Sequence, residues 1–183
     1  MTELELIRRA SEQLGADQPQ NMWFAKEGTI KLAVAYALHD TAREVARNPQ
    51  LRHHLQNLYE VTVTSGSADL TNSTAVPDVG TYAPILTEFA CYNLLLDADG
   101  NRYTYLEQYR DLLLDQPAVM GYYALAGQTL KTRELSSGDL AASASFTYLA
   151  SYIPTVAQLR GEIEDIAVEK LVSVLRSPVP EDA

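Results

Sequence analysis

Apolar residues recur at helical spacing near both ends of the chain. The first such segment begins with Thr2, followed three residues later by Glu5, a pairing that caps the start of a helix. Gly15 follows the segment, where a left-handed residue ends a helix without strain. The periodicity predicts helices over about residues 2–15, 29–47 and 159–176, with Asn48–Pro49 ending the second and opening a short one.

Between these segments the pattern changes to alternation. Tyr59, Val61 and Val63 lie on one side of an extended chain and the intervening polar residues on the other, as in a half-buried strand. Turn-forming residues divide the segments that follow. The pattern predicts a strand at 59–64, a hairpin joining the apolar segment 85–96 to residues 102–105, a hairpin over 119–135 turning near Ala126–Gly127, and a strand at 140–149.

Two stretches have no periodicity. Residues 71–84 are rich in Thr, Ser, Pro, Gly and Asp, and we expect a long surface loop that becomes ordered against a neighbouring molecule. Residues 177–183 contain two prolines and form an expected extended tail, which binds a partner through its side chains and carbonyls or else is a frayed end.

This order of elements predicts an α+β fold, with helices at both ends packed on a central antiparallel β-sheet and hairpin region. We expect one domain over residues 1–176, with helices in 1–58, a strand-rich middle at 59–153 and a C-terminal helix at 159–176. The 183-residue chain is long enough to bury a core without disulfides.

Charge excludes several functions. The chain has 14 Lys and Arg against 24 Asp and Glu, a net charge of −10, and no basic run, so we expect no binding to nucleic acid.

No stretch reaches the length of a membrane span, and the acidic start lacks the order of a secretory signal. The only cysteine, Cys91, lies in an apolar segment without a nearby histidine and is interpreted as a buried thiol.

A search for catalytic or metal-binding patterns finds little. The three histidines, His39, His53 and His54, lack the spacing of metal ligands. The segment Asp97–Asn101 begins like a calcium loop, but its glycine comes too early, so a hairpin turn explains it better. We therefore predict no catalytic residue, no metal, no cofactor and no enzymatic activity. Acidic residues of the last helix are interpreted as a solvated face, with a carboxylate site left as an alternative: Glu162, Glu164, Asp165 and Glu169.

Tyrosine is the residue in excess, with eleven copies against three Phe and one Trp. A tyrosine ring has an apolar face and a polar tip, which suits a partly hydrated interface, although about half of these rings are expected to face the core. The candidate assembly contacts are Tyr82, Tyr103, Tyr105, Tyr122 and Tyr148, together with Pro178, Val179 and Pro180 of the tail.

Three sequence segments resemble those of a known family. They are Val61-Thr-Val-Thr-Ser-Gly66, the segment from Met120-Gly-Tyr-Tyr to Lys-Thr-Arg133, and Phe146-Thr-Tyr-Leu-Ala-Ser-Tyr-Ile-Pro154 before the closing helix. Over about residues 58–176 the chain resembles the head-to-tail adaptor proteins of tailed bacteriophages. It departs from them after the first strands, where Asp69-Leu-Thr-Asn-Ser73 stands in place of a Leu-Pro-x-Asp phrase.

The resemblance implies a structural virion protein, made in the cytoplasm of the bacterial host. About twelve copies would form a ring beneath the portal, bind a downstream tail or neck protein and let DNA pass through an acidic channel without specific binding. Two alternatives stay open. One is another neck or tail component, such as a stopper, tail terminator or tail tube, and the other is a small carboxylate-based hydrolase or ligand-binding domain.

Overall fold

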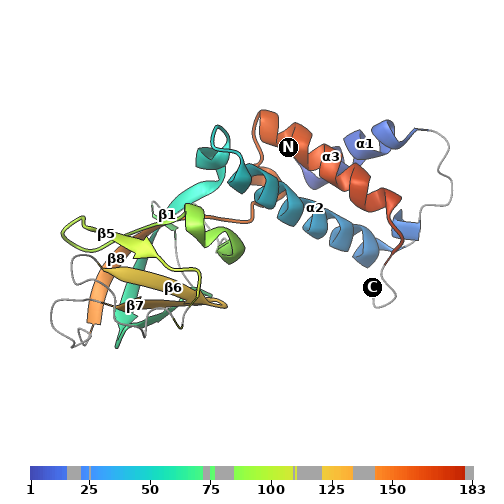
Figure 1. The fold of residues 1–183 in the computed structure, drawn as a ribbon. Coiled ribbons are helices and arrows are strands. Elements are labelled where there is room, and N and C mark those ends of the chain that lie inside the picture. The colour runs from blue at the N-terminus through green and yellow to red at the C-terminus, as the bar shows by residue number, and fades with distance from the viewer. Residues whose placement is uncertain are drawn as a thin grey trace. The chain divides into compact units, whose positions relative to one another are not determined.

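The computed structural model describes residues 1–15, 22–24, 26–71, 75–76, 85–108, 110, 121–133 and 143–179. The contacts group the chain into two compact units, both shown in Figure 1. Met1–Leu51 and Ile153–Ala183 form one, here called the helical unit, and Arg52–Tyr152 form the other, the barrel unit. The single domain expected over residues 1–176 is a separate prediction, which this grouping of contacts does not test.

The helical unit combines the two ends of the chain. Its elements are α1 (Glu3–Leu14), η1 (Met22–Phe24), α2 (Glu27–Arg47), η5 (Val156–Gln158) and α3 (Glu162–Arg176). The three predicted helices are confirmed, and the backbone N–H of Glu5 donates to Thr2 Oγ1 at 3.2 Å, as the capping pattern requires. The third begins later than predicted because η5 and Gly161, at φ 54°, precede it.

Helix α3 packs against both α1 and α2. The buried face of α2 is rich in small side chains, including Ala33, Ala37 and Thr41. The hydroxyl of Thr41 donates to the carbonyl of Ala37 at 2.7 Å and so is satisfied within its own helix. Because such small residues let helix backbones approach closely, the helices bury their apolar stripes on one another.

The strands that the structure describes all lie in the barrel unit. They are β1 (Gln56–Thr64), β2 (Ser67–Asp69), β3 (Ala75–Val76), β4 (Leu94–Leu96), β5 (Arg102–Tyr105), β6 (Tyr122–Ala126), β7 (Thr129–Arg133) and β8 (Ser143–Ser151). The order β2-β7-β6-β5-β4-β8-β1 returns to β2, which closes seven strands into a barrel, and β3 pairs only with β1. Among the described strands, only the pairing of β5 with β6 is parallel.

The prediction of helices packed on a central antiparallel sheet is therefore wrong. The sheet closes because Ser65 and Gly66 adopt positive φ angles of 48° and 72°, which turn the chain tightly from β1 into β2. Strand β2 then pairs with both β1 and β7, and the N–H of Thr132 donates to the carbonyl of Gly66 at 2.9 Å. Alternation along a strand predicts a buried face, but it does not say whether the two edges of the sheet meet.

The local predictions within the barrel fare better. The hairpin through Asp97–Asn101 is confirmed as β4 and β5, and the hairpin near Ala126–Gly127 is confirmed as β6 and β7. The predicted strands at 59–64 and 140–149 are confirmed in substance as β1 and β8, which pair along nine residues. Of the expected loop at 71–84, only Thr71 and the two residues of β3 lie within the described part of the chain.

The interpretation of Cys91 as a buried strand residue is wrong. Residues Thr87–Tyr92 form the 3₁₀-helix η3, in which Cys91 is exposed. The short helix predicted after Pro49 is the 3₁₀-helix η2 (Arg52–Leu55), which leads directly into β1. At Cys91 a short apolar run did not by itself distinguish a strand from a single helical turn.

Gly121 is required by the packing of the barrel. A Cβ atom built at this position would lie 2.2 Å from Cε1 of Tyr103, whose ring packs edge-on to Phe146 at a centroid distance of 5.1 Å. We expect Gly121→Ala to lower the free energy of unfolding by about 1–3 kcal/mol, as overpacked cores do. Urea unfolding followed by tyrosine fluorescence measures this.

Gly28→Ala is the matched control for that substitution. Gly28 lies in the first turn of α2 with open space where its Cβ would be, so we expect unchanged stability or a gain of about 0.5–1 kcal/mol. Equal losses in both variants would contradict the assigned role of Gly121.

Trp23 joins η1 to the end of α3. The indole is 2% exposed and its Nε1–H donates to the carbonyl of Ser177 at 2.7 Å. We expect Trp23→Phe to lower the free energy of unfolding of the helical unit by about 1–3 kcal/mol, because it removes the donor and part of the buried ring. Far-UV circular dichroism during urea unfolding measures the change, and the exposed neighbour provides the control Phe24→Leu, which should have no effect.

Candidate assembly surfaces

The structure separates the predicted contact tyrosines into two groups. Tyr103 and Tyr148 are 5% and 0% exposed, and their rings lie inside the barrel, where they offer no surface to another chain. Tyr105 and Tyr122 are half-buried. Tyr82 lies outside the described residues.

The tail residues divide differently. Pro178 is exposed and Val179 half-buried, whereas Pro180 lies outside the described residues. The carbonyl of Ser177 accepts the hydrogen bond from the buried indole of Trp23, so the first residue of the tail contributes a contact to the packing of the helical unit.

A polar network crosses the barrel interior. The side-chain amide of Asn93 donates to the Tyr148 hydroxyl at 2.8 Å, and its Oδ1 accepts from the backbone N–H of Ser151 at 3.2 Å. The Tyr123 hydroxyl lies 3.3 Å from the carbonyls of Ala90 and Asn93, to which it donates. Burial raises the pKa of both the Tyr123 and the Tyr148 phenol, so these rings stay neutral in the folded protein. The network is a structural element and presents no reactive group to solvent.

Asn93 is not among the residues predicted from the sequence. It is 4% exposed and stands between η3 and β4, in a segment that the hydrophobic pattern describes as uniformly apolar. The sequence signal that could have identified it is a single amide side chain inside an apolar run, because such a side chain is costly to bury unless it is hydrogen-bonded.

The candidate cation loop is a turn. The Oδ1 of Asp97 accepts from the N–H groups of Asp99 at 3.0 Å and Asn101 at 2.8 Å, and its Oδ2 accepts from the Asn101 side chain at 2.9 Å. Burial raises the pKa of Asp97, but these hydrogen bonds outweigh it, and the net direction is downward. The carboxylate is occupied in closing the hairpin, as expected of an Asx turn.

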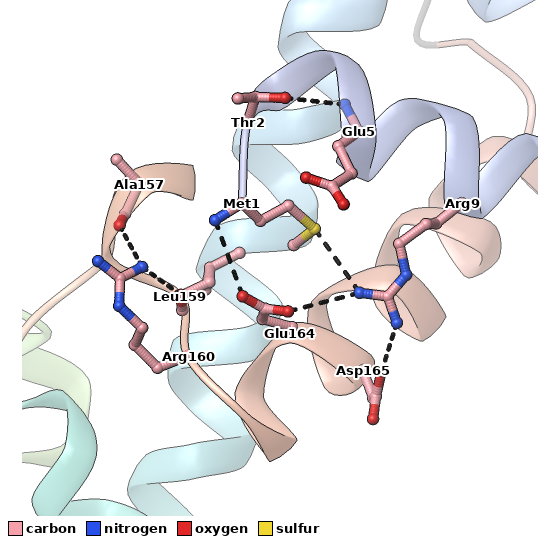
Figure 2. A network of polar contacts seen from close by, with 9 residues as sticks. All are labelled: Met1, Thr2, Glu5, Arg9, Ala157, Leu159, Arg160, Glu164 and Asp165. Atoms are coloured by element: carbon pink, nitrogen blue, oxygen red, sulfur yellow. Dashed lines mark hydrogen bonds and ion pairs between the residues drawn. The ribbon is translucent and has the colours of Figure 1, made fainter.

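Acidic residues at the start of α3 bind the first helix (Figure 2). The guanidinium of Arg9 lies 2.5 Å from Asp165 and 3.6 Å from Glu164, and the amino group of Met1 lies 3.7 Å from Glu164. Two of the carboxylates weighed as a catalytic pair therefore connect α1 to α3. Because these groups are partly solvated, the pairs contribute orientation more than stability.

An exposed patch combines aromatic, aliphatic and cationic side chains on the barrel unit. Tyr92 is 39% exposed, the guanidinium of Arg52 lies 4.0 Å above its ring, and the ring of Phe89 stacks beside it at 6.2 Å and 13°. The Gln56 side chain donates to the carbonyl of Tyr92, which connects η3 to the start of β1. We call Arg52, Phe89, Tyr92 and the leucines in the next paragraph the barrel patch.

Three leucines continue this patch across three adjacent strands. Leu149 of β8 is in register with Leu58 of β1 on one side and Leu94 of β4 on the other. Their neighbours Tyr59, Tyr148 and Leu95 point inward, so the leucines point outward, and Leu58 is 41% exposed. An outward apolar row next to exposed aromatics and an arginine is typical of the core of a protein interface.

The helical unit has its own exposed apolar residues. Phe24 of η1 is 45% exposed and follows Trp23 in the sequence, and the indole of Trp23 donates to Ser177, the residue before Pro178. We call Phe24, Pro178 and Val179 the tail patch. Leu4 of α1 and Tyr36 of α2 are also exposed, at 77% and 43%.

Metal and membrane searches find no candidate among the residues that the structure describes. There, no three His, Cys, Asp or Glu side chains gather as a metal site would require. No helix in the same residues has the length and apolar character needed to cross a bilayer. A scan against models of known protein families finds no match, and a search of curated protein sequences finds none either.

The interior tyrosines predict a specific alkaline response. Their folded-state pKa lies above the ordinary value of 10.0, so above that pH the unfolded chain releases protons that the folded chain retains. Stability is therefore complete below pH 10 and falls as the pH rises beyond it. We expect the last part of the tyrosinate absorbance to appear together with loss of the near-UV circular dichroism of the barrel.

Two variants calibrate this measurement. Tyr148→Phe removes one of the two protons and makes the loss of stability with pH shallower, whereas Tyr36→Phe, at an exposed position, leaves the alkaline midpoint unchanged. Complete tyrosinate formation while the near-UV signal persists would contradict a sealed interior.

Proposed function

We propose that this protein is a structural subunit that assembles into a ring, and that the ring is a head-to-tail adaptor of a tailed bacteriophage virion. The observation that carries the proposal is the presence of two unlike exposed apolar surfaces on two separately packed units, the barrel patch and the tail patch. A ring requires such a pair, because each copy must present one surface to the preceding neighbour and a different one to the next.

The composition of the barrel patch supports protein binding rather than catalysis. Tyrosine, phenylalanine and arginine are the residues enriched at interface hot spots, and here they occur together with leucines. Of the four carboxylates weighed for a site on the last helix, Glu164 and Asp165 bind Arg9, and Asp97, weighed as a calcium ligand, closes a turn. In the proposed ring the remaining exposed residues, Leu4 and Tyr36, are available to the portal above or the tail protein below.

The charge distribution suits a DNA channel without specific binding. The sequence of the helical unit has nine basic and thirteen acidic residues, and that of the barrel unit five and eleven, so both are net acidic. Walls of the same sign as the DNA backbone repel it, which would allow DNA to pass during packaging and ejection without being held.

Another neck or tail component is the competing proposal from the same class. A stopper, tail terminator or tail-tube protein would need the same pair of unlike surfaces and would share the lack of catalytic groups. The number of copies separates the two, since the adaptor proposal implies about twelve and the resemblance to that family is its only source.

Native mass spectrometry of the protein, alone and mixed with its portal, tests the proposal. We expect a ring of about twelve copies, which forms on the portal if not in isolation. Tyr92→Glu should abolish assembly while leaving the monomer folded, because a charge cannot be desolvated in the contact. Thr104→Glu, at another exposed position on β5, is the control and should assemble normally.

Three results would contradict the proposal. A ring of six would favour another neck component, and a closed dimer would exclude unlike surfaces. A stable monomer that ignores the portal would exclude the adaptor role itself.

A further inference from the structure

The tail leaves the helical unit at a fixed point. Ser177 follows the last residue of α3, its N–H donates to the carbonyl of Val174 at 2.9 Å, and its carbonyl accepts from the buried indole of Trp23 at 2.7 Å. The residues that follow therefore begin next to the indole of Trp23. An anchored start reduces the conformational entropy that the tail would lose on binding.

The tail has the chemistry of a polyproline ligand. Residues 178–183 read Pro-Val-Pro-Glu-Asp-Ala, in which two prolines restrict the backbone toward the polyproline II form. At about 3.1 Å per residue, these six residues reach about 19 Å from Ser177. Such segments bind by laying proline rings on exposed aromatic rings, and their carbonyls accept hydrogen bonds from nearby donors.

The barrel patch offers the matching surface. Phe89 and Tyr92 present a stacked, part-exposed aromatic pair, and Leu58 and Leu94 extend the apolar area beside it. The guanidinium of Arg52 lies 4.0 Å above the ring of Tyr92. Grooves lined by aromatic rings are the usual surfaces that bind polyproline segments.

The charges of the two segments predict the direction in which the tail would lie on the barrel patch. The short helix η2 carries Arg52, His53 and His54 in succession and no acidic residue, and the two histidine rings lie 4.0 Å apart. The tail carries Glu181 and Asp182 immediately after its prolines. A tail with its prolines on Phe89 and Tyr92 would bring its acidic end toward this basic segment, although η3 also contributes Glu88.

We infer that residues 178–183 of one copy bind the barrel patch of a neighbouring copy, with Pro178 and Pro180 on the rings of Phe89 and Tyr92 and Glu181 and Asp182 near η2. The inference rests on the proposed function, because it names the contact that joins successive subunits of the ring. The contact is heterologous: each copy gives its tail in one direction and accepts a tail from the other.

A peptide experiment separates this contact from ring assembly. The acceptor is the chain ending at Ser177, which keeps the carbonyl that Trp23 requires, and the probe is a fluorescent peptide of residues 177–183. We expect saturable binding by fluorescence anisotropy. Replacing both prolines of the peptide by alanine should weaken binding at least about tenfold, because the flexible peptide loses both preorganisation and ring contacts.

Acceptor variants locate the site. Tyr92→Ala should weaken peptide binding at least about tenfold, Tyr92→Phe should retain most of it, and Tyr36→Ala, on the exposed face of α2, should change nothing. Both positions are exposed, so circular dichroism should show unchanged folding. Loss of binding in Tyr36→Ala, or full binding in Tyr92→Ala, would overturn the assigned site.

The failure of this inference and the failure of the proposed function give different results. If the full chain forms rings but the peptide does not bind, the ring stands and the tail contact is wrong. If the peptide binds and the full chain remains monomeric even with the portal, the tail reaches the barrel patch of its own chain, which overturns the contact between copies. Peptide binding together with failure of the chain ending at Ser177 to form rings is the result that supports it.

Discussion

The packing of the barrel interior depends on hydrogen bonds to the phenols inside it. Large tyrosine rings fill the interior, and each one brings a hydroxyl that is costly to bury without a partner. Asn93 meets this requirement for Tyr148 and also holds the N–H of Ser151, while the carbonyls around η3 accept from Tyr123. Because these bonds join η3, β6 and β8, they keep strands from distant parts of the sequence in one closed sheet, and the outward leucines of β1, β4 and β8 remain in register.

The helical unit is assembled from both ends of the chain. The barrel is inserted between α2 and α3, and the antiparallel pairing of β1 with β8 brings the two crossing points together. Trp23 then ties the segment before α2 to the residue after α3. The two units thus have separate cores, and each presents an exposed apolar surface that its own packing does not cover.

Helices and hairpins could be predicted from the sequence because their signals are local. The capping residue Thr2, the turn at Asp97–Asn101 and the alternation of Tyr59 to Thr64 all appear as predicted. Closure of the sheet could not, because it depends on the meeting of β1 and β2 with β7, far apart in the chain. For the same reason, composition alone could not separate the core rings Tyr103 and Tyr148 from the exposed Tyr92, whose ring lies on a 3₁₀-helix that the hydrophobic run conceals.

Mixing two defective variants tests the central claim, that each copy binds its neighbours through two unlike surfaces. The chain ending at Ser177 lacks Pro178 and Val179 of the tail patch and keeps the barrel patch intact, and Tyr92→Glu in the full chain does the reverse. Under conditions in which the unmodified protein assembles, each variant alone should remain monomeric. Their equimolar mixture should form a heterodimer by native mass spectrometry, and no closed ring, because one intact contact remains. Dimers of either variant alone, or a mixture that stays monomeric, would contradict the account.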